Sequence, residues 1–374
     1  MLTLKLKSKV MITKPFLPPI EEYQDYLKKI WDSNWLTNNG PLHDKFEKEI
    51  GKYLNVNNVS LFTNGHLALD IAIKSLDLKG EVITTPFTFA STVHAITMNG
   101  LTPVFCDIEL ETFNIDVNKV EELITEKTSA IIPVHVFGNP CNVEEFEKIA
   151  QKYNLRVIYD AAHAFGVEIH GEGIGNYGDI SMFSLHATKV FHSIEGGILT
   201  FNDESLKTKL NKLKNFGIAD EEKVDLVGLN AKMNEFQAAM GLVNLRYINE
   251  QIEKRKQLTY AYRENLKNIE GIRYLYDIEG VKHNYAYFPI LIDESKFGMN
   301  RDCLYEKLKD YNIFTRKYFY PLCTDFDCYN FDSSNLKNAR FVSKNILTLP
   351  LYFELEIDEV IAICQIIKRL KEGF

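Results

Sequence analysis

Short β-rich runs alternate with helical runs through the first two thirds of the 374-residue chain. "VSLFTN" at 59–64 and "EVITTP" at 81–86 are each followed by a helical stretch. Further strands are expected within 102–108, 129–138 and 156–162, with a helix over 143–154. Strands and helices that alternate in this way favour a largely parallel sheet wrapped by helices. The sequence therefore predicts an α/β fold.

The alternation stops after residue 179. "DISMFSLH" (179–186) and "GILTFND" (197–203) leave no room for a full helix between them, so an antiparallel or mixed edge of the sheet is expected. The proline-free stretch 233–269, rich in good helix formers, predicts one long helix that links two domains. The remaining third reads as a small α+β unit.

The expected domain division follows from this pattern. We expect a large domain over 1–250 and a small C-terminal domain over 251–374. Where the first 20 or so residues pack stays open.

Composition and charge argue against several classes of partner. Acidic residues outnumber basic ones by 51 to 43. The sequence has no cluster of Lys and Arg of the kind that binds a phosphate backbone, so a nucleic acid partner is not expected. No stretch approaches the ~20 apolar residues of a membrane span, and the N-terminus lacks an apolar signal core. The six scattered cysteines form no C-x-x-C pair, so no metal site is expected. These features predict a cytoplasmic protein without a membrane partner.

A match to the G-x-G-x-x-G pattern lies at 173–178. That motif holds a pyrophosphate only when a helix N-terminus follows the glycines, and here a strand-like run follows instead. A tight surface turn is the favoured interpretation, and a nicotinamide dehydrogenase is a minor alternative.

The stretch "FSLHATKVFHSIEGG" (183–197) places Lys189 between a strand-like run and a Glu-Gly-Gly turn. At its ordinary pKa of ~10.4 a lysine is almost fully protonated at neutral pH, so a lysine nucleophile needs desolvation or a nearby cation. A lysine that forms a Schiff base with pyridoxal phosphate also needs three further groups. These are a phosphate site, an acid at the pyridine nitrogen and a flat group against the ring.

Candidates for all three groups occur at strand ends. Asp160 ends "RVIYD" and would point out of the carboxyl edge of the sheet, and "TNGHLAL" (63–69) opens a helix whose free N–H groups suit a phosphate. Ser184 could add a hydroxyl to the phosphate, and Phe89, or with less support Phe87, could cover the ring. Each feature alone also fits a structural role, as a strand-end cap, an ordinary helix start or core packing. Because all of these features occur together, in the order that a pyridoxal phosphate site requires, a cofactor site is favoured over separate structural roles.

Seven ordered motifs carry a resemblance to a known family: "TNGHLAL", "PFTFAST", "PVFCDIELETFNID", "PVHVFGNPCN", "IYDAAHAFGV", "FSLHATKVFHSIEGG" and "GLNAKMNEFQAA". In this order they resemble the DegT/StrS family of pyridoxal phosphate-dependent sugar aminotransferases over nearly the whole chain. The resemblance implies the aspartate aminotransferase-type fold (fold type I). It also implies a mixed, mostly parallel sheet wrapped by helices, a smaller α+β C-terminal domain and a homodimer.

The resemblance also implies roles for individual residues. Lys189 would form the Schiff base, Asp160 would bind the pyridine nitrogen, and His163 would lie near the ring hydroxyl. The remaining cofactor contacts would come from Phe89, Ser184, Asn64, Gly65 and His66, and from Asn230 of the neighbouring subunit.

Two positions depart from the family pattern. His66 stands where the family has threonine, so an imidazole or a backbone N–H must replace a hydroxyl contact to the phosphate. Lys232 replaces a common arginine, and an ammonium is not equivalent to a guanidinium. Some relatives carry histidine at the lysine position and dehydrate sugars, and Lys189 argues against that branch.

The implied reaction moves an amino group from L-glutamate, which leaves as 2-oxoglutarate, to a nucleotide-linked keto-sugar. The segments 14–41 and 312–322 resemble the dTDP-4-amino-4,6-dideoxyglucose transaminase branch, which implies amination at C4 of dTDP-4-keto-6-deoxy-D-glucose for a surface polysaccharide. Substrate contacts are expected from Trp35, Asn39, His186, Arg316, Tyr318 and Tyr320, with Arg316 meeting a diphosphate.

Three alternatives to this reaction remain. They are amination at C3 of an isomeric 3-keto sugar, a non-catalytic regulator that binds a sugar nucleotide, and an enzyme acting on ordinary amino acids. The last would need an arginine for the substrate carboxylate, which the sequence alone does not assign.

Overall fold

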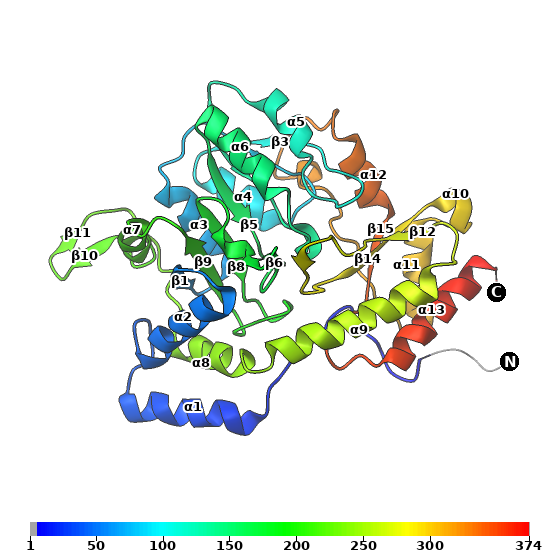
Figure 1. Ribbon diagram of the computed structural model, residues 1–374, viewed down its shortest axis with the longest axis horizontal. Coiled ribbons are helices and arrows are strands. Elements are labelled where there is room, and N and C mark those ends of the chain that lie inside the picture. Colours follow the sequence, from blue (N-terminus) through cyan, green and yellow to red (C-terminus); the bar gives the residue numbers. More distant parts are fainter. Residues whose placement is uncertain (1–5, 374) are drawn as a thin grey trace.

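The computed structural model describes residues 6–373. Its central sheet has seven strands, and helices cover it (Figure 1). Its strands follow the order β1-β9-β8-β5-β4-β2-β3. Their bounds are β1 Asn58–Phe62, β9 Gly197–Phe201, β8 Ile180–Ser184, β5 Arg156–Asp160, β4 Thr128–Ile132, β2 Glu81–Thr84 and β3 Thr102–Phe105. The pairs from β8 to β3 are parallel, whereas β9 runs antiparallel to both of its neighbours. The predicted mixed, mostly parallel sheet is confirmed.

The position of the antiparallel strand differs from the expectation. The sequence suggested an antiparallel or mixed edge, but β9 lies inside the sheet, because β1 covers its outer side from Asn58 to Phe62. The edge strand β1 precedes β9 by more than 130 residues, so only long-range pairing could reveal this order.

Strand residues alternate between two apolar layers, as the two-residue period of a strand requires. On β5, Ile158 packs on one side with helices α3 (Gly65–Ser75), α4 (Ala90–Met98) and α7 (Leu206–Leu213). Val157 and Tyr159 pack on the other side with α2 (Pro41–Leu54), α6 (Val143–Tyr153) and α8 (Glu235–Asn244). Both faces of the sheet are therefore buried, which is typical of parallel sheets.

The predicted long helix over 233–269 is two helices. A capping box at Asn234 starts α8, and α9 (Ile248–Leu266) begins after the short break at 245–247. The amphipathic helix α1 (Ile20–Ser33) packs against α8 (Figure 1). No glycine or proline marks the break, so helix propensity alone could not locate it.

A second apolar core lies at the C-terminal end of α9. Its strands are β12 (Ile272–Tyr274), β14 (Phe288–Ile292) and β15 (Ile346–Leu349), and its helices include α11 (Arg301–Asp310) and α13 (Ile357–Lys371). Val10 is buried in this core and pairs with Ile313, so the N-terminal segment packs on the C-terminal part of the chain. The first five of the 20 or so residues left open above lie outside the described residues. The boundary at residue 250 stays a prediction.

Several short elements complete the fold. They are α5 (Val117–Val120), β6 (Glu168–Ile169), β7 (Glu172–Gly173), β10 (Ile218–Asp220), β11 (Lys223–Val224), β13 (Val281–Lys282), α10 (Glu294–Phe297) and α12 (Lys337–Asn345). The β10–β11 hairpin projects from the body of the molecule (Figure 1). Among residues 6–373, no helix combines the length and the apolar character needed to cross a membrane.

The carboxyl ends of β1, β2, β5 and β8 meet at one edge of the sheet, and α3 and α4 begin there. In open α/β sheets this edge is where ligands bind.

Candidate active site

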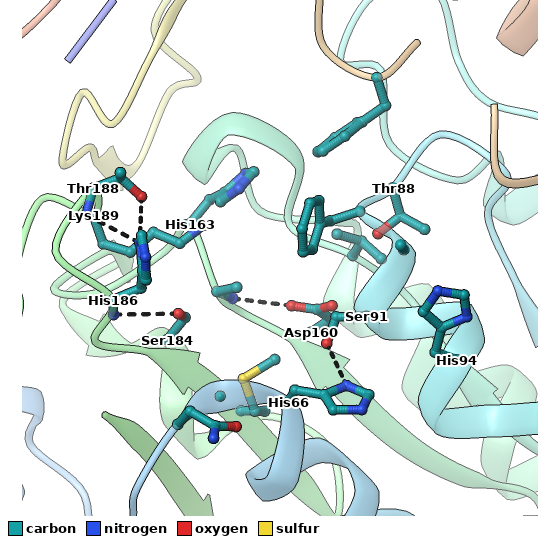
Figure 2. A pocket seen from close by; sticks show the side chains of 18 of the residues that line it. His66, Thr88, Ser91, His94, Asp160, His163, Ser184, His186, Thr188 and Lys189 are labelled. Atoms are coloured by element: carbon teal, nitrogen blue, oxygen red, sulfur yellow. Dashed lines mark hydrogen bonds between the residues drawn. The ribbon is translucent and has the colours of Figure 1, made fainter. Parts of the chain in front are cut away.

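A cavity of about 740 Å³ opens at this edge (Figure 2). It lies between the strand ends, the N-termini of α3 and α4, and the segment 316–319 from the C-terminal part of the chain. The predicted residues that line it are Asn64, Gly65, His66, Phe89, Asp160, His163, Ser184, His186, Lys189, Arg316 and Tyr318.

Lys189 lies in the loop between β8 and β9. The loop is closed at its base because Leu185 N donates to Gly196 O at 2.8 Å, and Lys189 N donates to His186 O at 2.9 Å. Burial lowers the pKa of Lys189; Tyr318 and Asp160 oppose this shift, while Arg316 adds to it. The lysine thus has the desolvated environment that a nucleophilic amine needs.

Asp160 ends β5 and is buried at 4% exposure. Its Oδ2 accepts a hydrogen bond from Thr92 Oγ1 at 2.7 Å, and its Oδ1 accepts one from Ala162 N at 3.1 Å. Burial raises the pKa of Asp160, whereas these two donors and Lys189 lower it. Its two hydrogen-bond donors are neutral groups, so this buried carboxylate suits a cationic N–H group of a ligand.

His163 presents a neutral imidazole to the cavity. Its Nδ1 accepts a hydrogen bond from Phe137 N at 3.2 Å, which assigns the ring proton to Nε2. Burial lowers the pKa of His163 well below its usual value. The ring lies nearly parallel to that of Phe137, at 6.2 Å and 10°. Nε2 is therefore the donor nitrogen of this cavity-lining ring.

The N-terminus of α3 forms an anion cradle. Asn64 caps the helix, because its Oδ1 accepts from Leu67 N at 2.9 Å. Within the described chain, the N–H groups of Gly65 and His66 have no acceptor. A Cβ at Gly65 would lie 3.1 Å from Ser184 Cβ, so glycine lets the serine approach the helix start. Two free N–H groups, a helix dipole and a hydroxyl are the donor set that a phosphate needs.

His66 bridges the two helices at the cavity. Its Nδ1 lies 2.9 Å from Ser91 Oγ on α4 (Figure 2). The imidazole that replaces the family's threonine therefore stays next to the cradle.

Phe89 and Phe87 occupy different environments. Phe89 lies at the start of α4, is 57% exposed and lines the cavity. Phe87 is fully buried beside Phe113, Phe137 and Phe319. Of the two, only Phe89 can cover a ring in the cavity. Phe89, the cradle, Asp160 and Lys189 together form a set of groups that fits pyridoxal phosphate.

Four predicted residues do not line the cavity of their own chain. Trp35 is about half exposed and donates from Nε1 to Asn38 O at 2.8 Å, while Asn39 is exposed in the next turn. Tyr320 packs under Arg301. Asn230 is exposed and pairs with Asn215.

Other cavity residues were not identified from the sequence. They are Thr88, Ser91, His94, Thr188, Glu195 and Phe319, among others. Glu195 Oε1 lies 3.4 Å from His186 Nε2, so these two side chains pair across the loop that carries Lys189. The strand-end position of "PFTFAST" and the Glu-Gly-Gly turn were the available signals, but neither shows which side chain faces the cavity.

Known proteins resemble this chain over nearly its whole length. Residues 19–368 match the model of the DegT/DnrJ/EryC1/StrS aminotransferase family. The chain is 45% identical over 368 residues to a dTDP-4-amino-4,6-dideoxy-D-glucose transaminase of Shigella dysenteriae, covering 98% of this chain and 100% of that protein. It is 46% identical over 363 residues to a protein of the same name from Escherichia coli, covering 96% and 98%.

A solved structure shows the same fold. The structure of DesI in the presence of its TDP-sugar product superposes with a TM-score of 0.94 at 32% identity, covering 98% of this chain and 94% of that one. The cavity brings a lysine, a buried carboxylate and the anion cradle together at one edge of the sheet. The chain belongs to the DegT/DnrJ/EryC1/StrS family of pyridoxal phosphate-dependent aminotransferases.

Proposed function

We propose that this enzyme transfers the amino group of L-glutamate to C4 of dTDP-4-keto-6-deoxy-D-glucose, releasing 2-oxoglutarate. The observation that carries the proposal is the near-complete coverage, at 45% and 46% identity, of two transaminases named for the 4-amino-4,6-dideoxy product. The cavity supports it, because one side contains the candidate cofactor residues and the rest of its wall contains polar groups for a second ligand.

Each residue has a defined task in this reaction. Pyridoxal phosphate, when bound, supplies an electron sink for the carbon that loses its proton. Lys189, whose pKa is lowered by burial, removes the proton from the donor's α-carbon and returns one to the product. Asp160 would hold the proton on the ring nitrogen, and His163, whose ring proton is on Nε2, would donate to the ring oxygen. The cradle at Gly65 and Ser184 would bind the phosphate.

The assembly that we propose is a homodimer with a site shared between subunits. Asn230 is exposed and outside its own cavity, so it is free to reach a partner's phosphate. The neighbouring β10–β11 region exposes Phe216, Val224 and Val227 at 50%, 66% and 81%. Exposed apolar side chains in one region are typical of an interface.

The cellular role that we propose is supply of an activated amino sugar for a surface glycan such as an O-antigen. A nucleotide-linked sugar is chemically a glycosyl donor, so a glycosyl-transfer reaction would consume the product. We propose the cytoplasm as the compartment. The six cysteines are free, and four of them are buried, which suits a reducing environment.

Incubation with L-glutamate and each keto-sugar separately tests the regiochemistry. NMR of the product locates the new C–N bond, and we expect it at C4, with no product from the 3-keto isomer. Product from the 3-keto sugar alone would overturn the C4 assignment and support the C3 alternative. Absence of any product, while glutamate still converts the cofactor, would overturn the sugar substrate and leave the transaminase chemistry in place.

A further inference from the structure

Arg316 has no counter-ion of its own in the cavity wall. It is the only arginine among the described residues that line the cavity, and its side chain is exposed there. Across residues 6–373, no Asp or Glu forms an ion pair with it. The two carboxylates of the cavity are engaged elsewhere: Asp160 with Thr92 and Ala162, and Glu195 with His186.

The backbone fixes the direction of this side chain. Arg316 N donates to Thr348 O at 3.2 Å, and Thr348 N donates to Arg316 O at 2.8 Å. In an extended segment successive side chains point to opposite sides. Lys317 accordingly points away from the cavity and pairs with Asp302 at 2.5 Å, whereas Arg316 and Tyr318 face it.

Tyr318 supports the guanidinium. The Cζ atom of Arg316 lies 4.5 Å from the centroid of the Tyr318 ring, within the range of a cation–π contact. The ring itself packs against Tyr287 at 5.4 Å and so has little freedom to move. The planar fork of Arg316 is therefore held in place before any ligand arrives.

The position of this charge selects between two anionic ligands. Arg316 and Lys189 line the same cavity, and the charge of Arg316 contributes to the lowered pKa of Lys189, so the cation shares a site with the proton-transferring amine. The α-carboxylate of the amino donor is bonded directly to the carbon that Lys189 deprotonates. A nucleotide diphosphate is separated from C4 by the width of the sugar ring. A guanidinium binds carboxylates and phosphates alike in a bidentate manner, so position relative to Lys189, and not ligand chemistry, favours the α-carboxylate.

We propose that Arg316 binds the α-carboxylate of the amino donor, with Tyr318 holding the guanidinium in plane. This inference rests on the proposed use of L-glutamate, and it replaces the diphosphate contact expected from the sequence. It also assigns the carboxylate-binding arginine that sequence patterns alone did not reveal.

The two half-reactions test the proposal separately. In the pyridoxal form, the enzyme reacts either with L-glutamate alone or with the amino-sugar nucleotide alone, and stopped-flow absorbance follows the cofactor in each case. For Arg316→Gln we expect kcat/KM with L-glutamate to fall about 100-fold or more, as for loss of one partner of a desolvated charge pair. The amino-sugar half-reaction should stay within about threefold of wild type, because the sugar carries no carboxylate.

A binding measurement removes the dependence on chemistry. α-Methyl-L-glutamate lacks the α-hydrogen and cannot be turned over, so its spectral titration gives a Kd. We expect this Kd to rise about 100-fold in Arg316→Gln and less in Arg316→Lys, which keeps the charge without the fork. The matched control is Lys317→Gln, one residue away and outside the cavity, which should leave the Kd unchanged.

Two results would overturn the proposal. A loss confined to the amino-sugar half-reaction would assign Arg316 to the nucleotide, and equal losses in both halves would make it a general support of the cavity. The titration with α-methyl-L-glutamate uses no sugar, so its outcome is independent of the sugar's identity. A wild-type enzyme that reacts with glutamate but with no dTDP-keto-sugar would refute the proposed function and leave the assignment of Arg316 testable.

Discussion

Thr92 on α4 donates a 2.7 Å hydrogen bond to Oδ2 of Asp160, which lies 68 residues later at the end of β5. Thr92 is fully buried and its hydroxyl also lies 2.8 Å from that of Thr88. Burial raises the pKa of Asp160, and the Thr92 hydroxyl lowers it. The hydroxyl therefore helps to keep the carboxylate ionised in an apolar setting.

Replacing Thr92 with valine removes this donor at nearly constant volume. Hydrogen bonds to charged groups contribute ~1.5–3 kcal/mol, so kcat should fall about 10- to 100-fold. Without the donor the pKa of Asp160 rises further, so the acidic limb of the pH–rate profile should move to higher pH. Thr92→Ser should restore both quantities. An acidic limb that does not move would show that Thr92 only fills space.

Replacing Lys189 with alanine should abolish turnover while cofactor binding persists through the cradle, Asp160 and His163. The wild-type protein should be yellow, and borohydride should bleach it and fix the cofactor on Lys189, as peptide mass spectrometry would show. The variant should lose the cofactor on denaturation even after borohydride. Turnover near the wild-type rate in Lys189→Ala would refute the assignment of the nucleophile.

Lys214 makes stability depend on pH. Its side chain is 3% exposed, and Nζ donates to Ser60 Oγ at 2.9 Å and to Leu61 O at 3.2 Å. Burial lowers the pKa of Lys214 from 10.5 to about 8. Below pH 8 the amine is protonated in both the folded and the unfolded chain, so burying the charge lowers the free energy of unfolding by its full amount. Between pH 8 and 10.5 the folded chain loses the proton first, and this loss of stability is relieved.

The free energy of unfolding of wild type, relative to Lys214→Met, should therefore increase from pH 8 to 10.5, by up to ~1.4 kcal/mol per pH unit. Urea unfolding of both proteins at a series of pH values measures this difference. A flat difference would mean that the amine stays protonated in the folded chain.

Substitution of Asn230 tests whether the active site is shared between two subunits. If Asn230 reaches the partner's phosphate, Asn230→Ala alone should be impaired. Mixing inactive Lys189→Ala chains with Asn230→Ala chains should then form hybrid dimers with one intact site, and activity should rise as subunits exchange. Size-exclusion chromatography with light scattering would establish the dimer. Activity that stays flat after confirmed exchange would exclude a contribution from the partner subunit.

Much of the fold follows from patterns within short stretches of sequence and could therefore be predicted. Runs such as "RVIYD" have the apolar pattern of buried strands, and the structure places β5 over Arg156–Asp160. The interior position of β9 could not be predicted, because its pairing with β1 joins residues that lie far apart in sequence. The break between α8 and α9 also has no local marker.

The candidate site divides in the same way. Asp160, Gly65 and Lys189 occur where a strand ends, a helix starts or a loop turns, and these positions can be read locally. The contribution of Thr92 depends on how α4 packs over β5, and that of Glu195 on how the lysine loop folds back. Such contacts arise only from tertiary packing.

The antiparallel strand β9 has a mechanical consequence. Gly197 begins β9 opposite Ser184, and a Cβ at Gly197 would lie 2.4 Å from Asn64 O, so the lysine loop and the phosphate cradle touch through their backbones. The loop that carries Lys189 therefore cannot move without displacing the cradle. The distance between the lysine and a phosphate in the cradle is thus fixed by a rigid part of the molecule. We expect opening and closing around substrates to involve the segment that carries Arg316, moving as one unit with Tyr318, because its backbone pairs with β15 at Thr348. Hydrogen exchange should show early protection changes there, while the amides around Gly197 exchange slowly throughout.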